Sequence, residues 1–232
     1  MVQVNSTPIN LRVRFKKVGN LQYISHLDLV RTMNKIIVRS KLPLWYTEGF
    51  NPKPKMVFAA PLSIGTESKC ELLDIRLTER IDPSLAKEML NRNLTDEMQV
   101  LEAYYPDSKF TELKWLSYTI SIKTDSADEA LASKCEAALL ADRVEVEKKT
   151  KSKETVVADI RPMIKSVNAV FDGENIKLSC VLSADPSLYL SPEYIIKALK
   201  RECGILSSGN LLAEYSSIMR EEAYREDMSR FI

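Results

Sequence analysis

The sequence predicts an α+β protein that contains two units of similar organisation, each with an antiparallel sheet. Three observations lead to this prediction. Apolar and polar residues alternate with a period of two over residues 9–17, which is typical of a half-buried strand. An amphipathic helix pattern follows, and a similar succession of strand and helix patterns begins again near residue 115. The order strand–helix–strand–strand–helix–strand, repeated along the chain, indicates two tandem ferredoxin-like (βαββαβ) units.

Residues 1–106 supply the elements of the first unit. Ser25 and Asp28 have the spacing of a capping box, so we expect a helix to begin there and to end near Lys41, before Pro43. Gly49 and two prolines in 48–55 are incompatible with regular structure and predict a loop. The other expected elements are strands at 9–17, 44–47, 56–60, 70–77 and 98–105 and a helix at 82–93.

Residues 115–220 supply the second unit. Ser191 is expected to cap a helix whose first residue is Pro192, and Asp172-Gly173 is typical of a hairpin turn. Residues 221–232 are rich in charge and are expected to form a mobile tail or a terminal helix. The remaining expected elements are strands at 115–124, 143–148, 156–160, 163–171, 176–184 and 211–219 and helices at 127–141 and 192–203.

The charge of the chain is distributed unevenly. The 232 residues have a formal net charge of only +1, yet residues 1–60 contain ten Lys and Arg residues and only two acids, Asp28 and Glu48. The remaining residues carry 23 basic and 30 acidic side chains. Such an asymmetry predicts a basic surface that faces a polyanion, or a basic subdomain that docks on an acidic one.

Several classes of protein do not fit the sequence. Apolar runs are far shorter than the roughly 20 residues that span a bilayer, and the first residues lack the features of a signal peptide. We therefore expect a cytoplasmic protein that does not enter a membrane. Cys70, Cys135, Cys180 and Cys203 are widely spaced, so we expect reduced, buried thiols and no metal or other cofactor bound by this chain alone.

The basic side chains of the first strand are one candidate binding surface. Leu11, Val13 and Phe15 are expected to face the helices, which directs Arg12, Arg14 and Lys16 towards the open side of the sheet. Their spacing of about 6.6 Å is close to the phosphate spacing of an extended nucleic-acid strand. A solvated strand face without a ligand is the alternative.

The loop at 48–55 is the second candidate. Pro52 and Pro54 favour an extended path, so Lys53 and Lys55 would project with little conformational entropy left to lose. Phe50 and other aromatic residues close by in the sequence offer surfaces on which bases could stack, and Asn51 belongs to the same loop. The alternative is a rigid connection between two strands.

His26 is the only histidine and a candidate for acid–base chemistry. It is expected at the start of the helix, where the helix dipole disfavours the imidazolium form. No partner lies next to it in the sequence, and helix capping explains Ser25 and Asp28, so these neighbours do not indicate a Ser-His-Asp triad. A packed or capping histidine is the simpler interpretation.

Three blocks of the sequence, Leu21–Arg31, Leu42–Lys55 and Ala60–Ser68, occur in this order along the first part of the chain. Together they resemble a bacterial family of unknown function, the radical-SAM-linked protein family, which is found beside or fused to B12-binding radical-SAM proteins. The family's loop usually reads Asn-Pro-His-Pro-Lys, whereas this chain has Lys53 at the histidine position, which leaves a cationic contact there.

The resemblance implies an accessory role beside a B12-binding radical-SAM enzyme, which would carry the iron–sulfur cluster, SAM and cobalamin. Our first hypothesis is a non-catalytic module that binds RNA, the partner enzyme or both through Arg12, Arg14, Lys16, His26, Phe50, Asn51, Lys53 and Lys55. The alternative, by analogy of fold with CRISPR RNA endonucleases, is a metal-independent RNA-processing enzyme. In that enzyme His26 and a tyrosine such as Tyr23 or Tyr46 would perform the acid–base chemistry.

Overall fold

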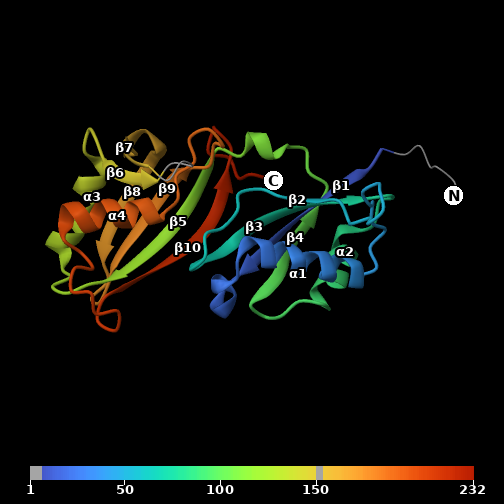
Figure 1. Cartoon of the computed structure of the whole chain (residues 1–232), viewed down its shortest axis with the longest axis horizontal. Coiled ribbons are helices and arrows are strands. Elements are labelled where there is room, and N and C mark those ends of the chain that lie inside the picture. Colours follow the sequence, from blue (N-terminus) through green and yellow to red (C-terminus); the bar gives the residue numbers. More distant parts are fainter. Residues whose placement is uncertain (1–6, 150–153) are drawn as a thin grey trace. The chain divides into compact units, whose positions relative to one another are not determined.

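The computed structural model describes residues 7–149 and 154–232 (Figure 1). It confirms the α+β class. The chain divides into two compact units, of which the first comprises the residues up to Phe110 together with Ile232 and the second Thr111–Phe231. Each unit combines an antiparallel sheet with two α-helices.

The first unit contains four strands and two α-helices among its described residues. The strands lie in the order β4-β1-β3-β2, and each neighbouring pair is antiparallel. A short 3₁₀ helix, Gly19–Tyr23, joins the first strand to the first α-helix. The elements are β1 (Ile9–Lys17), α1 (His26–Arg39), β2 (Met56–Phe58), β3 (Thr66–Leu77), α2 (Pro83–Asn91) and β4 (Met98–Tyr104).

Both helices of the first unit pack on the same side of its sheet. The alternation in β1 places Leu11, Val13 and Phe15 in this core, as predicted, where they meet the apolar stripe of α1 and two residues of α2. Their neighbours across the ladder, Leu73 and Ile75 of β3, are fully buried as well. Because the apolar stripe of α1 packs in this core, the polar side of the helix faces away from the sheet.

The outer edge of β4 is covered by side chains of α2. Asn91 donates from Nδ2 to the carbonyl of Val100 and accepts from its N–H, and Lys87 donates to the carbonyl of Leu101. These bonds satisfy backbone groups that would otherwise be open to pairing with another strand. They also tie α2 to the sheet.

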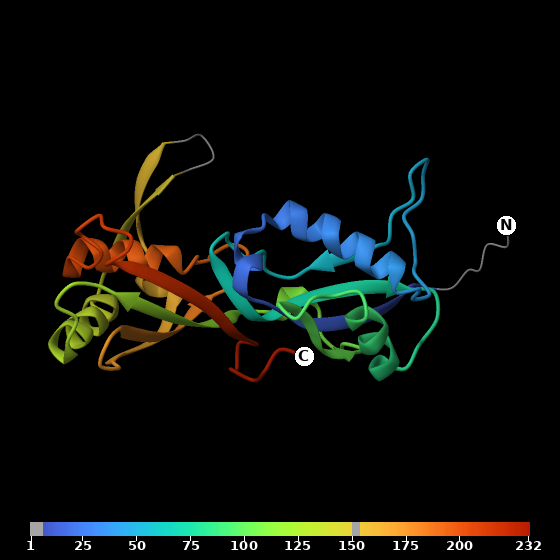
Figure 2. The same ribbon diagram turned by 90° about the horizontal axis from the view of Figure 1, so that it is seen from below.

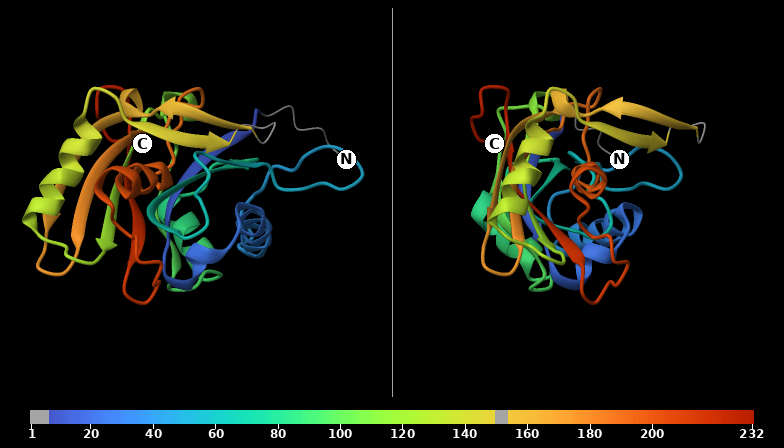
Figure 3. Two further views of the ribbon diagram at one scale, coloured as in Figure 1. Left: turned by 60° about the vertical axis from the view of Figure 1, so that its left-hand side comes forward. Right: turned by 90° about the vertical axis from the view of Figure 1, so that its left-hand side faces the viewer.

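The second unit has a sheet in the order β10-β5-β9-β8. A separate two-stranded hairpin, β6–β7, lies between α3 and β8 in the chain and extends away from that sheet (Figure 3). Ile120 of β5 and Leu178 of β9 lie directly opposite each other in the ladder and are fully buried. The elements are β5 (Trp115–Lys123), α3 (Glu129–Leu140), β6 (Glu145–Lys149), β7 (Thr155–Asp159), β8 (Ile164–Phe171), β9 (Ile176–Ser183), α4 (Glu193–Cys203) and β10 (Tyr215–Tyr224). Two short 3₁₀ turns, Phe110–Glu112 and Arg161–Met163, complete the described elements.

Three predictions about elements are wrong in detail. Residues 44–47 form only isolated bridges at Leu44 and Tyr46, because the prolines at 43 and 54 limit the backbone hydrogen bonds available there. Helix α4 begins after Pro192, which takes the cap position expected for Ser191. Residues 221–224 belong to β10 rather than to a tail, and Phe231 is buried, with its N–H donating to the carbonyl of Ala223.

Candidate nucleic-acid interface

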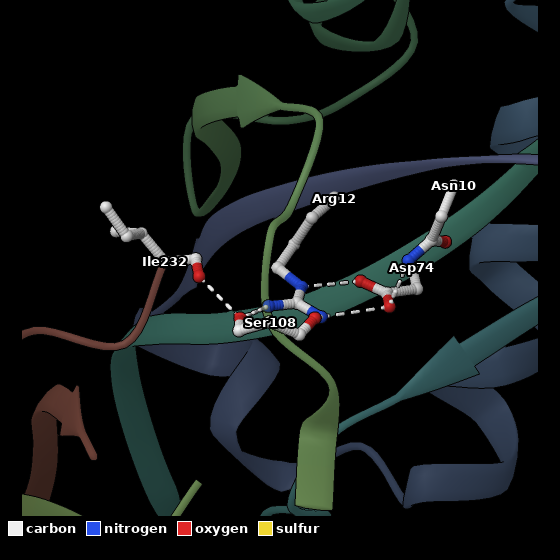
Figure 4. Close-up of polar contacts among 5 residues, drawn as sticks. All are labelled: Asn10, Arg12, Asp74, Ser108 and Ile232. Atoms are coloured by element: carbon white, nitrogen blue, oxygen red, sulfur yellow. Dashed lines mark hydrogen bonds and ion pairs between the residues drawn. The ribbon is translucent and has the colours of Figure 1, made fainter. Parts of the chain in front are cut away.

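Arg12 does not lie on an open surface, contrary to the prediction. Its side chain is fully buried, and its Nε and Nη2 donate to the two carboxylate oxygens of Asp74 at 2.7 and 3.1 Å (Figure 4). The connection after β4 covers this part of the sheet, so Nη1 donates to Ser108 Oγ and the guanidinium lies over the ring of Phe110. Ser108 Oγ in turn donates to the main-chain oxygen of Ile232.

The other two strand cations are also poorly placed to bind a ligand. Arg14 is largely buried, with 13% of its side chain exposed, and forms an ion pair with Glu102 at 3.1 Å. Lys16 is half-buried. Interruptions in the β1 ladders between Arg14 and Lys17 disturb the strict alternation from which an exposed basic row was predicted. The strand therefore offers no continuous cationic face.

Helix α1 presents a different row of cations. Ser25 caps the helix as predicted: its Oγ accepts from the N–H of Asp28 and donates to that carboxylate. The hydrogen bond that Ser25 Oγ donates to the carboxylate, and then the one from Arg31, lower the pKa of Asp28. Arg31, Lys35 and Arg39 recur every four residues on the exposed side, which corresponds to a spacing of about 6 Å along the helix axis.

The segment between α1 and β2 forms a narrow hairpin beside this row. Thr47 donates from N–H to the carbonyl of Lys53, Lys55 donates to the carbonyl of Trp45, and Tyr46 pairs with Pro54. Gly49 adopts a φ of +116° at the tip, a backbone conformation that other residues rarely adopt. Figure 2 shows the hairpin projecting from the unit on the side where α1 lies.

Between α1 and the hairpin lies a groove of about 440 Å³, which we call the α1 groove. Four of its seven lining residues are cations and none is acidic. Arg31 pairs with Asp28 at 3.2 Å, but both side chains are more than half exposed, so this pair holds Arg31 only weakly. Within the described residues, the side chains of Lys35, Arg39 and Lys53 form no ion pair. The lining residues are Arg31, Asn34, Lys35, Val38, Arg39, Lys53 and Pro54.

Of the eight predicted site residues, only Lys53 lines the α1 groove. Phe50, Asn51 and Lys55 are exposed elsewhere on the hairpin. His26 packs its ring edge-to-face on Phe58, with centroids 5.2 Å apart, which is a packing role. Arg31, Lys35 and Arg39 line the groove but are not among the eight predicted site residues. Their spacing of four residues was the signal that could have identified them.

The cysteines do not gather into a metal site. Cys70, Cys135, Cys180 and Cys203 belong to β3, α3, β9 and α4, and burial raises the pKa of Cys135 and of Cys180 to about 12. Over residues 7–149 and 154–232, no group of three or more His, Cys, Asp or Glu side chains is placed to hold a metal ion.

The second unit has a hollow of different character. About 350 Å³ in volume, it lies over β5, β8 and β9, where Ser117, Thr119 and Asn168 are among the lining side chains. No Lys or Arg lines it, so it lacks the charge that a phosphate would need. None of the helices in the described part of the chain is long and apolar enough to cross a membrane.

The fold and the α1 groove define an α+β protein of two units with a cationic groove on the first. The sequence matches the family described as "Uncharacterized protein conserved in bacteria (DUF2344)" over residues 10–192, and the chain belongs to that family. No curated protein matches the sequence.

Three solved structures illustrate how far the likeness to known folds extends. A Cbf5-Nop10-Gar1 complex has a TM-score of 0.49 and 9% identity, covering 94% of this chain and 50% of that one. The archaeal box H/ACA sRNP Nop10-Cbf5 complex has a TM-score of 0.44 and 9% identity, covering 90% and 46%. An unknown protein from Galdieria sulphuraria has a TM-score of 0.26 and 10% identity, covering 92% and 99%. This chain spans about half the length of the first two. Because the TM-scores are below 0.5, they support no argument about function.

The buried ion pair yields a stability prediction. Replacing Asp74 by Ala leaves the buried Arg12 guanidinium without its carboxylate and should lower the free energy of unfolding by about 3–5 kcal/mol, measured by urea denaturation. Glu88→Ala, which removes the exposed pair with Arg92, is the control and should cost less than about 1 kcal/mol. The double variant Arg12→Met, Asp74→Leu should recover much of the loss; equal effects of Asp74→Ala and Glu88→Ala would contradict the prediction.

Proposed function

We propose that this chain is a non-catalytic accessory protein whose first unit binds RNA through the α1 groove. The observation that supports this most strongly is the gathering of four cations, from two separate segments, around a groove without an acidic lining residue. The hairpin contributes Lys53 and the helix contributes the other three. Neither segment by itself would make a groove.

The charge of the groove suits the phosphates of a nucleic acid. A row of cations at intervals of about 6 Å can contact successive phosphates of one strand, and each contact releases condensed counterions. Lys35, Arg39 and Lys53 line one groove without an acidic residue, and their like charges repel one another there. A bound polyanion would neutralise these charges and so relieve their mutual repulsion, which favours binding.

The strand orders support a finer assignment of the fold, and we infer that both units are ferredoxin-like. In the first unit the fourth, first, third and second strands lie side by side in that order. The second unit repeats the order if β5, β8, β9 and β10 are taken as its four strands. On this assignment the β6–β7 hairpin is an insertion between the first helix and the second strand.

We further propose that the chain serves a B12-binding radical-SAM protein in the cytoplasm. The support is the resemblance of Leu21–Arg31, Leu42–Lys55 and Ala60–Ser68 to proteins associated with such enzymes. In this arrangement the partner supplies the iron–sulfur cluster, SAM and cobalamin, and this chain presents the RNA.

The RNA proposal predicts a salt-dependent interaction that charge reversal removes. Changing Lys35, Arg39 and Lys53 together to Glu should abolish binding of a labelled RNA measured by fluorescence anisotropy. For the unaltered chain, four phosphate contacts predict a slope of log K against log salt of about −3 with single-stranded RNA.

The control reverses three exposed cations outside the groove, Arg92, Lys134 and Lys200, and so makes the same change in net charge. It should retain most of the affinity. Equal loss in the two triple variants would mean that net charge, rather than the α1 groove, determines binding and would refute the proposal.

The partner proposal predicts a stable complex. The tagged chain, purified from its native cells, should bring down a radical-SAM protein that contains cobalamin, identified by mass spectrometry and by its absorption spectrum. The Lys35, Arg39 and Lys53 reversal should retain this protein while it loses RNA. A preparation with RNA but without any radical-SAM protein would remove this part of the proposal.

The alternative, RNA cleavage that uses His26, can be tested separately. Because the ring of His26 packs on Phe58, we expect His26→Ala to leave RNA intact or processed to the same extent as the unaltered chain. Cleavage by the unaltered chain that disappears in His26→Ala would establish the endonuclease instead. Product formation is read on denaturing gels in the presence of EDTA.

A further inference from the structure

The α1 groove combines charge with apolar surface, which narrows the kind of RNA that suits it. Val38 and Pro54 line the groove among the four cations, and Val38 is 47% exposed. A groove that only held phosphates would gain nothing from apolar side chains beside the cations. The faces of bases are apolar, and they suit such a surface.

Two aromatic side chains lie on the hairpin that forms one wall. Tyr46 pairs directly with Pro54 across the hairpin, and residues directly opposite in an antiparallel pair point to the same side. Tyr46, which is 43% exposed, therefore lies on the same side of the hairpin as Pro54, which lines the groove. Phe50 lies at the tip and is fully exposed, so it contributes no burial to the fold.

These observations favour unpaired RNA over a duplex. In an A-form duplex the faces of the bases are stacked on each other and cannot reach an aromatic ring, whereas an unpaired strand can splay its bases onto one. We propose that the α1 groove binds single-stranded RNA, with phosphates on Arg31, Lys35, Arg39 and Lys53 and bases stacked on Tyr46 and Phe50. This inference rests on the proposed function and specifies its substrate class.

The test compares single-stranded and double-stranded probes of equal length. Fluorescence anisotropy with a labelled RNA of about 12 nucleotides and with the corresponding duplex should show tighter binding of the single strand. Tyr46→Ala with Phe50→Ala should weaken binding of the single strand by about tenfold or more and leave duplex binding unchanged. Phe50→Trp should retain the affinity, because it keeps an aromatic face.

The control variant is Leu85→Ala, which removes an exposed apolar side chain of α2 and should change neither affinity. Equal affinities for the two probes, together with no effect of the aromatic substitutions, would overturn this inference and leave the proposed RNA binding intact. Absence of binding to either probe at about 50 mM salt would overturn the proposed function itself. An affinity for acidic protein but not for RNA would have the same consequence.

Discussion

The ion pair between Arg12 and Asp74 is the interaction on which the first unit depends most. The two residues lie directly opposite in the β1–β3 ladder, so a slip of the register would separate two buried charges. The same guanidinium holds Ser108, which brings the connection after β4 across the sheet. The side chain of Arg12 thus stabilises both the register of β1 with β3 and the position of the connection that covers the sheet.

The connection after β4, which covers this face of the sheet, affects which basic side chains of the first unit are exposed. Arg12 and Lys17 are buried, and Arg14 pairs with Glu102, so the strand uses its cations for structure. Arg31, Lys35 and Arg39 of α1 lie exposed instead, because the apolar stripe of that helix directs them to solvent. The unit therefore presents its charge on the helix side rather than on the open side of the sheet.

The hairpin between α1 and β2 converts an ordinary polar helix face into a groove. Its prolines restrict the backbone, and hydrogen bonds at Thr47 and Lys55 close its base, so Lys53 is held beside α1 at little entropic cost. The tip then carries Phe50 into solvent. A rigid loop with an exposed aromatic ring next to cations is a suitable platform for a flexible, charged ligand, because the loop itself loses little conformational entropy on binding.

By itself, the sequence determined the α+β class, the alternation in β1, the cap at Ser25 and most element positions, because these depend on local periodicity and turn chemistry. Only the tertiary structure decided which cations are available. Arg12 and Lys16 look alike in the alternation, yet Arg12 is buried because a segment nearly one hundred residues away folds over it. The α1 groove likewise arises from two segments brought together by the core. A count of charges in the sequence predicts neither the burial of Arg12 nor the formation of the α1 groove, because both depend on contacts between residues that are distant in the chain.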